Sequence, residues 1–367
     1  MNKTLLTFGE VMGRLEPDPN QFRMSQSLPG LLRLTFAGSE SNVAASFAMF
    51  GGSAKYVTAL PKDNPLTNAY IRQMRSLGVD VSDIVESDVG RFGTFYLETG
   101  AMQRPSKVWY DRGGSSVSLL GPEAYDWESI FSGVYRLHIS GVTPAISEKA
   151  AETSIAIVKK AHEHGVKVSI DLNFRKKLWD WRPGTKANDL ANEIIEQIIV
   201  YTDVIIGNEE DAHDVLKIQP GDSDVTAGKL EVERYADVAK KVCEKFPNVE
   251  LVAFTLRESI SANHNNWGAM VWNNSTKTAH FAPLKGTTYD PYNMTHIVDR
   301  VGGGDSFAAS LLFALQDDDY KHSTQECVEF AVAASCLCHS IKGDFNFVTK
   351  DEVELLKKGD ASGRVSR

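Results

Sequence analysis

Three consecutive glycines followed by an aspartate, Gly302-Gly303-Gly304-Asp305, are the residues of this chain with the clearest chemical potential. Glycine lets a backbone approach a ligand closely, because no Cβ stands in the way. Residues 306–315 are rich in Ala and Leu and predict a buried helix. A loop that opens a helix presents unpaired N–H groups and the positive end of the helix dipole, which together attract an anion. Asp305 would repel that anion, unless its task is to take a proton from the group that attacks a phosphate.

A second interpretation of the same residues needs no ligand. A glycine-rich turn followed by Asp305 and Ser306 would begin a helix in the same way, since a carboxylate stabilises a helix N-terminus. The spacing also differs from two common phosphate-binding loops. The chain has no Gly-x-x-x-x-Gly-Lys-Ser/Thr sequence, and no Gly-x-Gly-x-x-Gly sequence follows the first predicted strand. A dinucleotide-dependent oxidoreductase therefore has only the predicted fold class in its favour.

Two arginines are predicted to lie beside one pocket. Arg175 follows a buried strand, 166–171, at its carboxyl end, and Arg112 follows a strand-like run, 106–111. Guanidinium groups bond a carboxylate in a bidentate way, whereas a neutral sugar needs no such pair. Arg112 could also be a solvated surface charge. If both arginines face the pocket, they predict an acidic substrate.

Strands and helices alternate from residue 136 onward, which predicts an α/β fold with a doubly wound, mostly parallel sheet flanked by helices. Ligands bind at the carboxyl ends of the strands in such folds. The runs 93–98 and 106–111 and the irregular segment 13–35 stand apart from this alternation, and they predict a small β-sheet that closes over the site as a lid. The other predicted strands are 4–8, 54–60, 137–140, 166–171, 204–207 and 251–255, and the predicted helices include 37–50, 65–77, 147–164, 190–201 and 232–245.

The composition limits the class of protein and its partners. The chain has 367 residues, of which 42% are apolar and 24% charged, and this suits one large α/β domain with a small appendage, or two domains. A net charge of −9 argues against nucleic acid or an anionic membrane surface as a partner. The N-terminal residues 1–8 are too few for a signal peptide or a membrane span. Four cysteines without a Cys-x-x-Cys pair predict reduced thiols and a cytoplasmic protein.

Two segments resemble signatures of a known family. The run Asp299–Phe307 resembles the C-terminal signature of the ribokinase-like (PfkB) carbohydrate kinases, D-x-x-G-A-G-D-x-F, with Gly303 where that family usually has Ala. Residues 37–44 resemble the family's N-terminal signature, G-G-x-x-x-N-x-A, with Ala37 in place of the first Gly. The resemblance covers nearly the whole chain, residues 5–349.

The resemblance implies a ribokinase-like fold and ATP-dependent phosphorylation of a carbohydrate hydroxyl. Asp305 would be the base that takes the hydroxyl proton, and the backbone N–H groups of Gly302–Gly304 would stabilise the transferring phosphoryl group. Gly38 and Asn42 of the N-terminal signature would contact sugar hydroxyls. Asn42 could instead serve at the start of the following helix.

Two further segments look similar to those of the 2-keto-3-deoxygluconate kinases, a branch of the same family. In that branch a D-x-N-x-R stretch, matched here by residues 171–175, and a Y-x-R on the lid, matched by 110–112, hold a sugar acid. The likeness implies phosphorylation of 2-keto-3-deoxygluconate on its terminal hydroxyl, giving the 6-phosphate. The loop 343–346 is where the family contacts substrate or adenine. The implied substrate-binding residues are Gly38, Asn42, Tyr96, Tyr110, Arg112, Arg175, Asp305 and Asp344.

The resemblance also implies ATP and magnesium. Residues 208–211, Asn-Glu-Glu-Asp, resemble the family's N-x-x-E motif, which orders water around magnesium, with Asp211 in place of the final Glu and with Glu210 as a second candidate. An acidic first turn of a helix explains these residues without a metal. The sequence leaves open whether a monovalent cation activates the enzyme. The implied ATP-binding residues are Asn208, Thr255, Arg257, Gly302 and Gly304.

Together these inferences predict a cytoplasmic sugar-acid kinase. The alternatives are a PfkB kinase for a neutral sugar such as fructose or ribose, and a non-catalytic regulator that binds sugar or nucleotide. Exposed strand edges of the lid favour a homo-oligomer in which two lids pair. The predicted core consists of residues 1–12, 38–90 and 118–350, the predicted lid of 13–37 and 91–117, and the C-terminus, 351–367, of a helix end and a disordered tail.

Overall fold

The computed structural model describes residues 3–18, 21–219 and 230–359. The end of the predicted disordered tail, from residue 360 on, lies outside the described residues.

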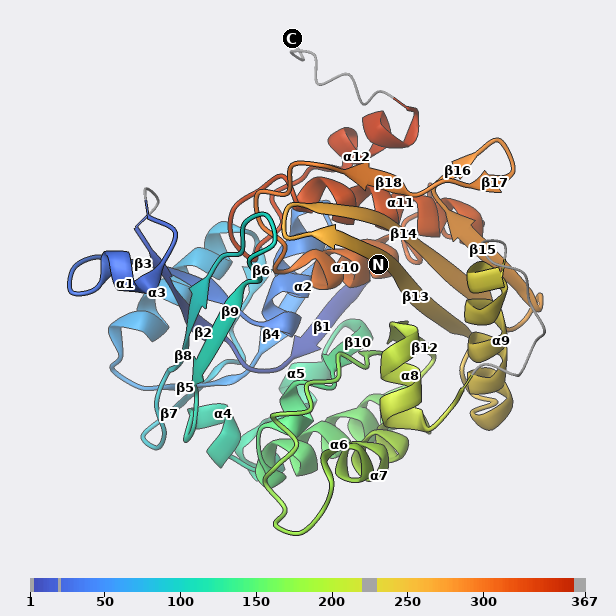
Figure 1. Ribbon diagram of the computed structural model, residues 1–367. Coiled ribbons are helices and arrows are strands. Elements are labelled where there is room, and N and C mark those ends of the chain that lie inside the picture. Colours follow the sequence, from blue (N-terminus) through green and yellow to red (C-terminus); the bar gives the residue numbers. More distant parts are fainter. Residues whose placement is uncertain (1–2, 19–20, 220–229, 360–367) are drawn as a thin grey trace.

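A large, mostly parallel sheet forms the centre of the molecule (Figure 1). Its middle strands are short apolar runs that are buried on both faces, as is typical of parallel strands covered by helices on each side. The strands at one end run antiparallel to their neighbours. The order across the sheet is β15 (Thr278–Ala282), β14 (His264–Asn273), β13 (Leu251–Ser261), β12 (Val204–Gly207), β11 (Lys167–Asp171), β10 (Val134–Ser140), β1 (Thr4–Phe8), β4 (Ala54–Val57) and β6 (Val79–Asp80), and β18 (Tyr292–Met294) pairs with β14.

Helices cover both faces of this sheet, and adjacent strand residues divide between the two cores. Leu5 of β1 packs with one group of helices and Leu6 with the other, because successive side chains of a strand point to opposite faces. The predicted doubly wound α/β fold is confirmed. One face carries α2 (Ser39–Met49), α3 (Pro65–Ser76), α10 (Gly303–Ala314), α11 (Thr324–Cys338) and α12 (Lys350–Lys357), and the other carries α5 (Trp127–Phe131), α6 (Glu148–Glu163), α7 (Ala187–Ile199), α8 (Glu209–Leu216) and α9 (Leu230–Lys245).

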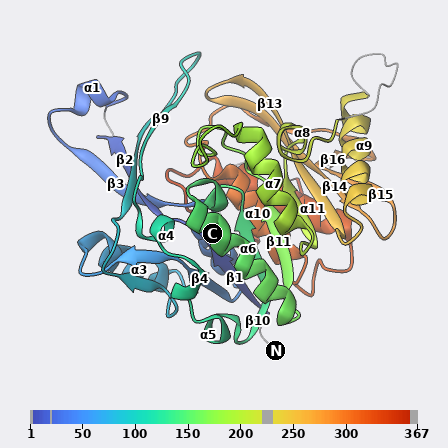
Figure 2. The same cartoon turned by 90° about the horizontal axis from the view of Figure 1, so that it is seen from below.

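A separate four-stranded sheet, called the small sheet below, comes from the two segments predicted as a lid. Figure 2 shows it rising on one side of the molecule, with β13 and β14 on the other side. Its two central strands are parallel, and each outer strand pairs antiparallel with its neighbour. Whether the small sheet closes over a site stays a prediction. Its order is β3 (Leu32–Ala37), β2 (Met12–Pro17), β8 (Gly93–Glu98) and β9 (Lys107–Asp111).

Short elements complete the described chain. Among the described residues, no helix combines the length and the apolar character that crossing a membrane requires. The short elements are α1 (Met24–Ser27), α4 (Ser116–Leu119), the 3-10 helices Pro122–Ala124 and Thr143–Ala145, the parallel pair β5 (Ala59–Pro61) and β7 (Val85–Ser87), and the hairpin β16 (Leu284–Lys285) and β17 (Thr288–Tyr289).

Candidate active site

A cleft of about 610 Å³ lies at the carboxyl ends of β11 and β12 and beside the middle of β13, at the edge of the sheet where the sequence predicted the site. The small sheet contributes Met12, Phe95 and Tyr110 to its wall. The cleft brings together nearly all the residues that the sequence analysis singled out. These are Gly38, Asn42, Tyr110, Arg112, Arg175, Asn208, Glu210, Asp211, Thr255, Arg257, Gly302, Gly303, Gly304, Asp305 and Asp344.

The glycine loop, Gly302–Gly304, leads directly into α10. Gly302 has φ +83°, and a Cβ there would lie 2.6 Å from the carbonyl oxygen of Asp344, so both its backbone conformation and its surroundings require glycine. A Cβ on Gly303 would lie 2.5 Å from the buried ring of His339. This neighbour gives a local reason for glycine at a position where the family usually has Ala. Among the described residues, none beyond its own helical turn comes within 4 Å of a Cβ placed on Gly304, which leaves room for a ligand.

Asp305 lies in the first turn of α10, and two side chains of α2 hold its carboxylate. Ser39 Oγ donates to Oδ1 and Asn42 Nδ2 donates to Oδ2, each at 2.7 Å. Asn42 Oδ1 accepts the N–H of Gly38 at 3.2 Å, which fixes the direction of its amide. Burial raises the pKa of Asp305, while the bonds from Asn42 and Ser39 and the charge of Arg175 act to lower it. The result is an oriented carboxylate with increased proton affinity.

Two more carboxylates, Asp171 and Asp211, line the same cleft. Burial raises the pKa of Asp171, and the negative charges of Asp211 and Asp305 raise it further. Burial also raises the pKa of Asp211 to about 6, although the N–H groups of Phe174 and Asn208 bond to its oxygens at 3.1 and 3.2 Å. Asp211 thereby forms a capping box with Asn208 at the start of α8.

These acidic residues fit a hydrated magnesium ion. Within the described ranges, no group of three or more His, Cys, Asp or Glu side chains is arranged to hold a metal by itself. Magnesium, however, keeps several waters and needs only one or two carboxylates besides phosphate oxygens. A divalent cation near Asp171 and Asp211 would offset the repulsion that raises the pKa of Asp171. Glu210 also lines the cleft and is exposed.

The two predicted carboxylate-binding arginines both line the cleft, in different environments. Arg112 is buried, forms an ion pair with Glu10, and lies 5.5 Å from the ring centre of Tyr110, so it is not a solvated surface charge. Arg175 is exposed, and Nη1 bonds the carbonyl of Phe174 at 3.2 Å. Its charge acts to lower the pKa of Asp171, Asp211 and Asp305, so it lies close to the acidic groups of the cleft.

Tyr96 and Asp344, both predicted to bind the substrate, lie in environments that the sequence did not predict. In β8, Phe95 lines the cleft and Tyr96 does not, because neighbouring residues of a strand point to opposite faces. Asp344 does line the cleft, but its carboxylate is buried and accepts a hydrogen bond from Arg14. Direct contact of either residue with a substrate stays a prediction.

The structure adds residues to the site that the sequence analysis did not select. Ser39 bonds both Asp305 and, at 3.3 Å, the amide of Asn173, whose φ of +35° is uncommon outside glycine. Arg300 is half-buried at the cleft, and burial together with repulsion from Arg257 lowers its pKa. Ser39 follows the selected Gly38, and Arg300 lies two residues before the selected Gly302, so each belongs to a segment that resembles a family signature. This proximity was the available signal.

Comparisons with known proteins agree with this geometry. The sequence model of the pfkB family carbohydrate kinases matches residues 2–256. A 2-dehydro-3-deoxygalactonokinase from Haloferax volcanii is 31% identical over 363 residues, 98% of this chain and 99% of that protein. The crystal structure of 2-dehydro-3-deoxygluconokinase from Thermotoga maritima is similar with a TM-score of 0.85 and 40% identity, over 98% of this chain and 99% of that one. A fructokinase from Xylella fastidiosa with bound ATP shares the fold, with a TM-score of 0.73 and 19% identity over 98% and 100% of the two chains.

Proposed function

Because this chain belongs to the pfkB family of carbohydrate kinases, we propose that it uses ATP to phosphorylate a hydroxyl group of a sugar acid. The proposed substrate is 2-keto-3-deoxygluconate (2-dehydro-3-deoxygluconate) or its galactonate epimer. The similar proteins from Thermotoga and Haloferax are named for activity on 2-dehydro-3-deoxygluconate and 2-dehydro-3-deoxygalactonate, which supports this substrate class.

One observation carries the proposal. A single cleft contains an oriented carboxylate, Asp305, beside a glycine loop at a helix N-terminus, together with Arg112 and Arg175. A kinase of a neutral sugar has no use for two guanidinium groups at its sugar site, whereas the carboxylate of a sugar acid accepts bonds from both.

Asp305 would act as the general base. It takes the proton of the substrate hydroxyl as that oxygen bonds to the γ-phosphorus of ATP and the bond from this phosphorus to the ADP oxygen breaks. Ser39 and Asn42 hold the carboxylate in place, and its raised pKa favours proton uptake. The N–H groups of Gly302–Gly304 would stabilise the charge on the transferring oxygens.

The cations of the site would divide between the two substrates. Arg112 and Arg175 would bind the sugar carboxylate, while Arg257 and Arg300, with Asn208 and Thr255, would contact ATP. In an acidic protein, such local positive charge gives phosphate a favourable place to bind. Magnesium, held through water by Asp171, Asp211 and Glu210, would neutralise phosphate charge when bound.

The decisive experiment compares acceptors side by side. ADP release with Mg-ATP is measured with 2-keto-3-deoxygluconate, 2-keto-3-deoxygalactonate, gluconate, fructose and ribose. We expect strong turnover with one or both keto-deoxy acids and weak turnover with fructose and ribose. Turnover mainly with a neutral sugar would reject the carboxylate pocket, and no turnover with any acceptor would favour a regulator that binds without catalysis. Repeating the assay in potassium and tetramethylammonium salts decides whether a monovalent cation is required.

We also propose that two copies associate through the small sheet. On the face turned away from the cleft, its outer strands β3 and β9 carry the exposed apolar side chains of Leu34 and Trp109, which are 39% and 45% exposed. A patch of this kind and free strand edges favour pairing with an identical surface. Light scattering is expected to give the mass of a dimer for the wild type and of a monomer for Trp109→Glu. A monomeric wild type would reject the proposal.

A further inference from the structure

Arg14 is a buried guanidinium that the proposed chemistry does not use. It lies in the middle of β2 in the small sheet, and its side chain is completely buried. Met12, Arg14 and Glu16 share one face of the strand, and Met12 lines the cleft. Arg14 therefore points from the small sheet toward the core of the protein, beside the proposed site.

Three carboxylates surround this guanidinium. Glu16 accepts from Nε at 3.0 Å and from Nη2 at 2.6 Å. Asp299 also accepts from Nη2, and Asp344 accepts from Nη1. Burial acts to lower the pKa of Arg14, but the charges of Asp344, Asp299 and Glu16 raise it above its ordinary value. The guanidinium thus remains charged while it bonds three acidic groups together.

The two distant partners of Arg14 hold the glycine loop from both sides. Asp299 precedes the loop, and its oxygens accept the N–H groups of Val301 at 3.2 Å and Gly343 at 3.1 Å. Asp344 lies against the loop itself, since its carbonyl oxygen would be 2.6 Å from a Cβ on Gly302. One side chain of the small sheet is therefore bonded to both segments that shape the loop.

The chemistry of this contact requires arginine. A planar guanidinium presents five N–H donors in a fixed fork and can bond three carboxylates at once, whereas an ammonium group is a single flexible point charge. Three buried carboxylates beside a phosphate-binding loop would also repel the phosphate. Arg14 offsets part of that charge, and Lys342 Nζ lies 3.6 Å from Glu16 as a second, more distant cation.

We propose that Arg14 is a positioning residue that fixes the glycine loop to the small sheet. The wall of the cleft that the small sheet forms and the glycine loop are then held as one unit. The proposal rests on the proposed function, because the loop's role toward phosphate is part of it. It also gives the carboxylate of Asp344 the task of shaping the loop.

The test uses Arg14→Lys, which keeps the positive charge and loses the fork. Arg14→Met leaves three buried carboxylates facing one another and is expected to impair folding, so it is the secondary variant. For Arg14→Lys we expect kcat to fall about 10- to 100-fold with little change in the KM for the sugar acid, since small misplacements of reacting groups have effects of this size. Hydrogen exchange should become faster at the amides of residues 300–305 and stay unchanged in the strands of the main sheet.

A matched control lies beside the same sheet, just before β8 begins. Arg91 forms an exposed ion pair with Asp111, with Nη2 and Oδ2 2.9 Å apart, and Arg91→Lys should change neither kcat nor loop exchange. If Arg14→Lys lowers the melting temperature but leaves kcat and loop exchange at wild-type values, Arg14 only stabilises the fold and the proposal is rejected. A wild type without sugar-acid kinase activity would reject the proposed function instead, and loop exchange would still decide the role of Arg14.

Discussion

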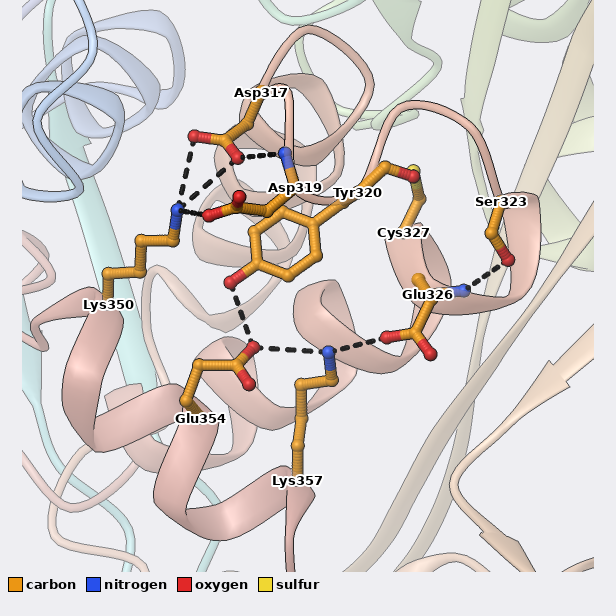
Figure 3. Close-up of polar contacts among 9 residues, drawn as sticks. All are labelled: Asp317, Asp319, Tyr320, Ser323, Glu326, Cys327, Lys350, Glu354 and Lys357. Carbon is orange, nitrogen blue, oxygen red and sulfur yellow. Dashed lines mark hydrogen bonds and ion pairs between the residues drawn. The ribbon is translucent and has the colours of Figure 1, made fainter.

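Two carboxylates of the cleft, Asp171 and Asp211, and the Glu354 carboxylate of α12 have pKa values shifted in opposite directions. Figure 3 shows the group around Glu354, here called the α12 cluster, in which each lysine is bonded to two carboxylates. Its tyrosine ring lies within 4.9 Å of both ammonium groups and donates a hydrogen bond to a carboxylate. The α12 cluster consists of Asp317, Asp319, Tyr320, Glu326, Lys350, Glu354 and Lys357.

The surroundings in the α12 cluster favour the charged forms of Lys350, Glu354 and Lys357. Burial acts to raise the pKa of Glu354, but hydrogen bonds from Tyr320 and Lys357 lower it below the ordinary value. Burial likewise acts to lower the pKa of Lys357, but bonds to Glu326 and Glu354 raise it. Glu354 and Lys357 are therefore both more easily charged in the folded protein than in water, so folding gains from their pairing.

The surroundings in the cleft favour the neutral forms of its acidic side chains. Burial and neighbouring negative charges raise the pKa of Asp171, and burial raises that of Asp211 to about 6. Carboxylates that only stabilise the fold are expected to contact cations directly, as Glu326 and Glu354 contact Lys357 in the α12 cluster. Unbalanced acidic groups in a cleft instead suit a ligand or metal that brings the missing positive charge.

The largest effect is expected from Asp305→Asn. The amide cannot take a proton, so kcat should fall about 1,000-fold, within the range found for general bases. ATP affinity should change little, because the variant keeps the shape of the side chain. Turnover assays and ATP titration measure the two effects separately. Near-normal turnover would show that the raised pKa of Asp305 has no catalytic meaning.

Arg175→Ala tests whether the exposed guanidinium of Arg175 binds the carboxylate of the substrate. We expect kcat/KM for the sugar acid to fall about 10- to 100-fold, the usual cost of losing a charged hydrogen bond. Lys176→Ala, next in the chain and outside the lining of the cleft, is the control and should resemble the wild type. Equal small losses in both variants would contradict a carboxylate site at Arg175.

Glu40→Gln tests the cost of a buried acidic group next to the cleft. Burial raises the pKa of Glu40 to about 7, from the ordinary value of 4.5, against the bonds that Oε1 accepts from Ser140 and Thr143. A folded-state pKa above the unfolded value means that stability is lost as pH rises from about 4.5 to about 7. Glu40→Gln should therefore be more stable than the wild type at pH 8, by about 3 kcal/mol, and similar to it at pH 4.

Urea unfolding of both proteins at several pH values measures this difference. A variant that is less stable than the wild type at every pH would mean that the carboxylate is held charged by its hydrogen bonds, as Glu354 is in the α12 cluster.

Lys357→Met should give the smallest effect of the four. Removing this cation leaves Glu326 and Glu354 less well paired, which should lower the free energy of unfolding by about 1 kcal/mol, near the upper limit for exposed pairs. kcat should stay at the wild-type value. Lys149→Met, which breaks an exposed pair with Glu152, is the control for stability. A fall in kcat would show that the α12 cluster and the cleft are coupled after all.

Local sequence patterns were sufficient for the parts of the site that lie within one segment. The glycine loop and Asp305 precede a recognisable helix, and Asp171 ends a recognisable strand, so their places follow from rules that act over a few residues. The resemblance joined these segments into one site. It did not determine which face of β8 points to the cleft, and Tyr96 was selected where the structure has Phe95.

Contacts between distant segments could not be read in the same way. Arg14 is one basic residue in an otherwise ordinary strand, and its partners Asp299 and Asp344 are 285 and 330 residues away. The predicted strand 251–255 was too short for a similar reason. β13 continues to Ser261 because β14 pairs with it along nearly its whole length, and that pairing depends on a second segment.

The parallel pairing of β2 with β8 has a consequence for how the chain reaches this structure. Leu15 lies opposite Tyr96, although some 80 residues separate them, and those residues include β4, α3 and β6 of the main body. Parallel strands need such a long crossover, so the pairing of β2 with β8 depends on that part of the main body to bring the two strands together. The small sheet is therefore not expected to fold on its own, because an isolated copy would lack the connection that aligns β2 with β8.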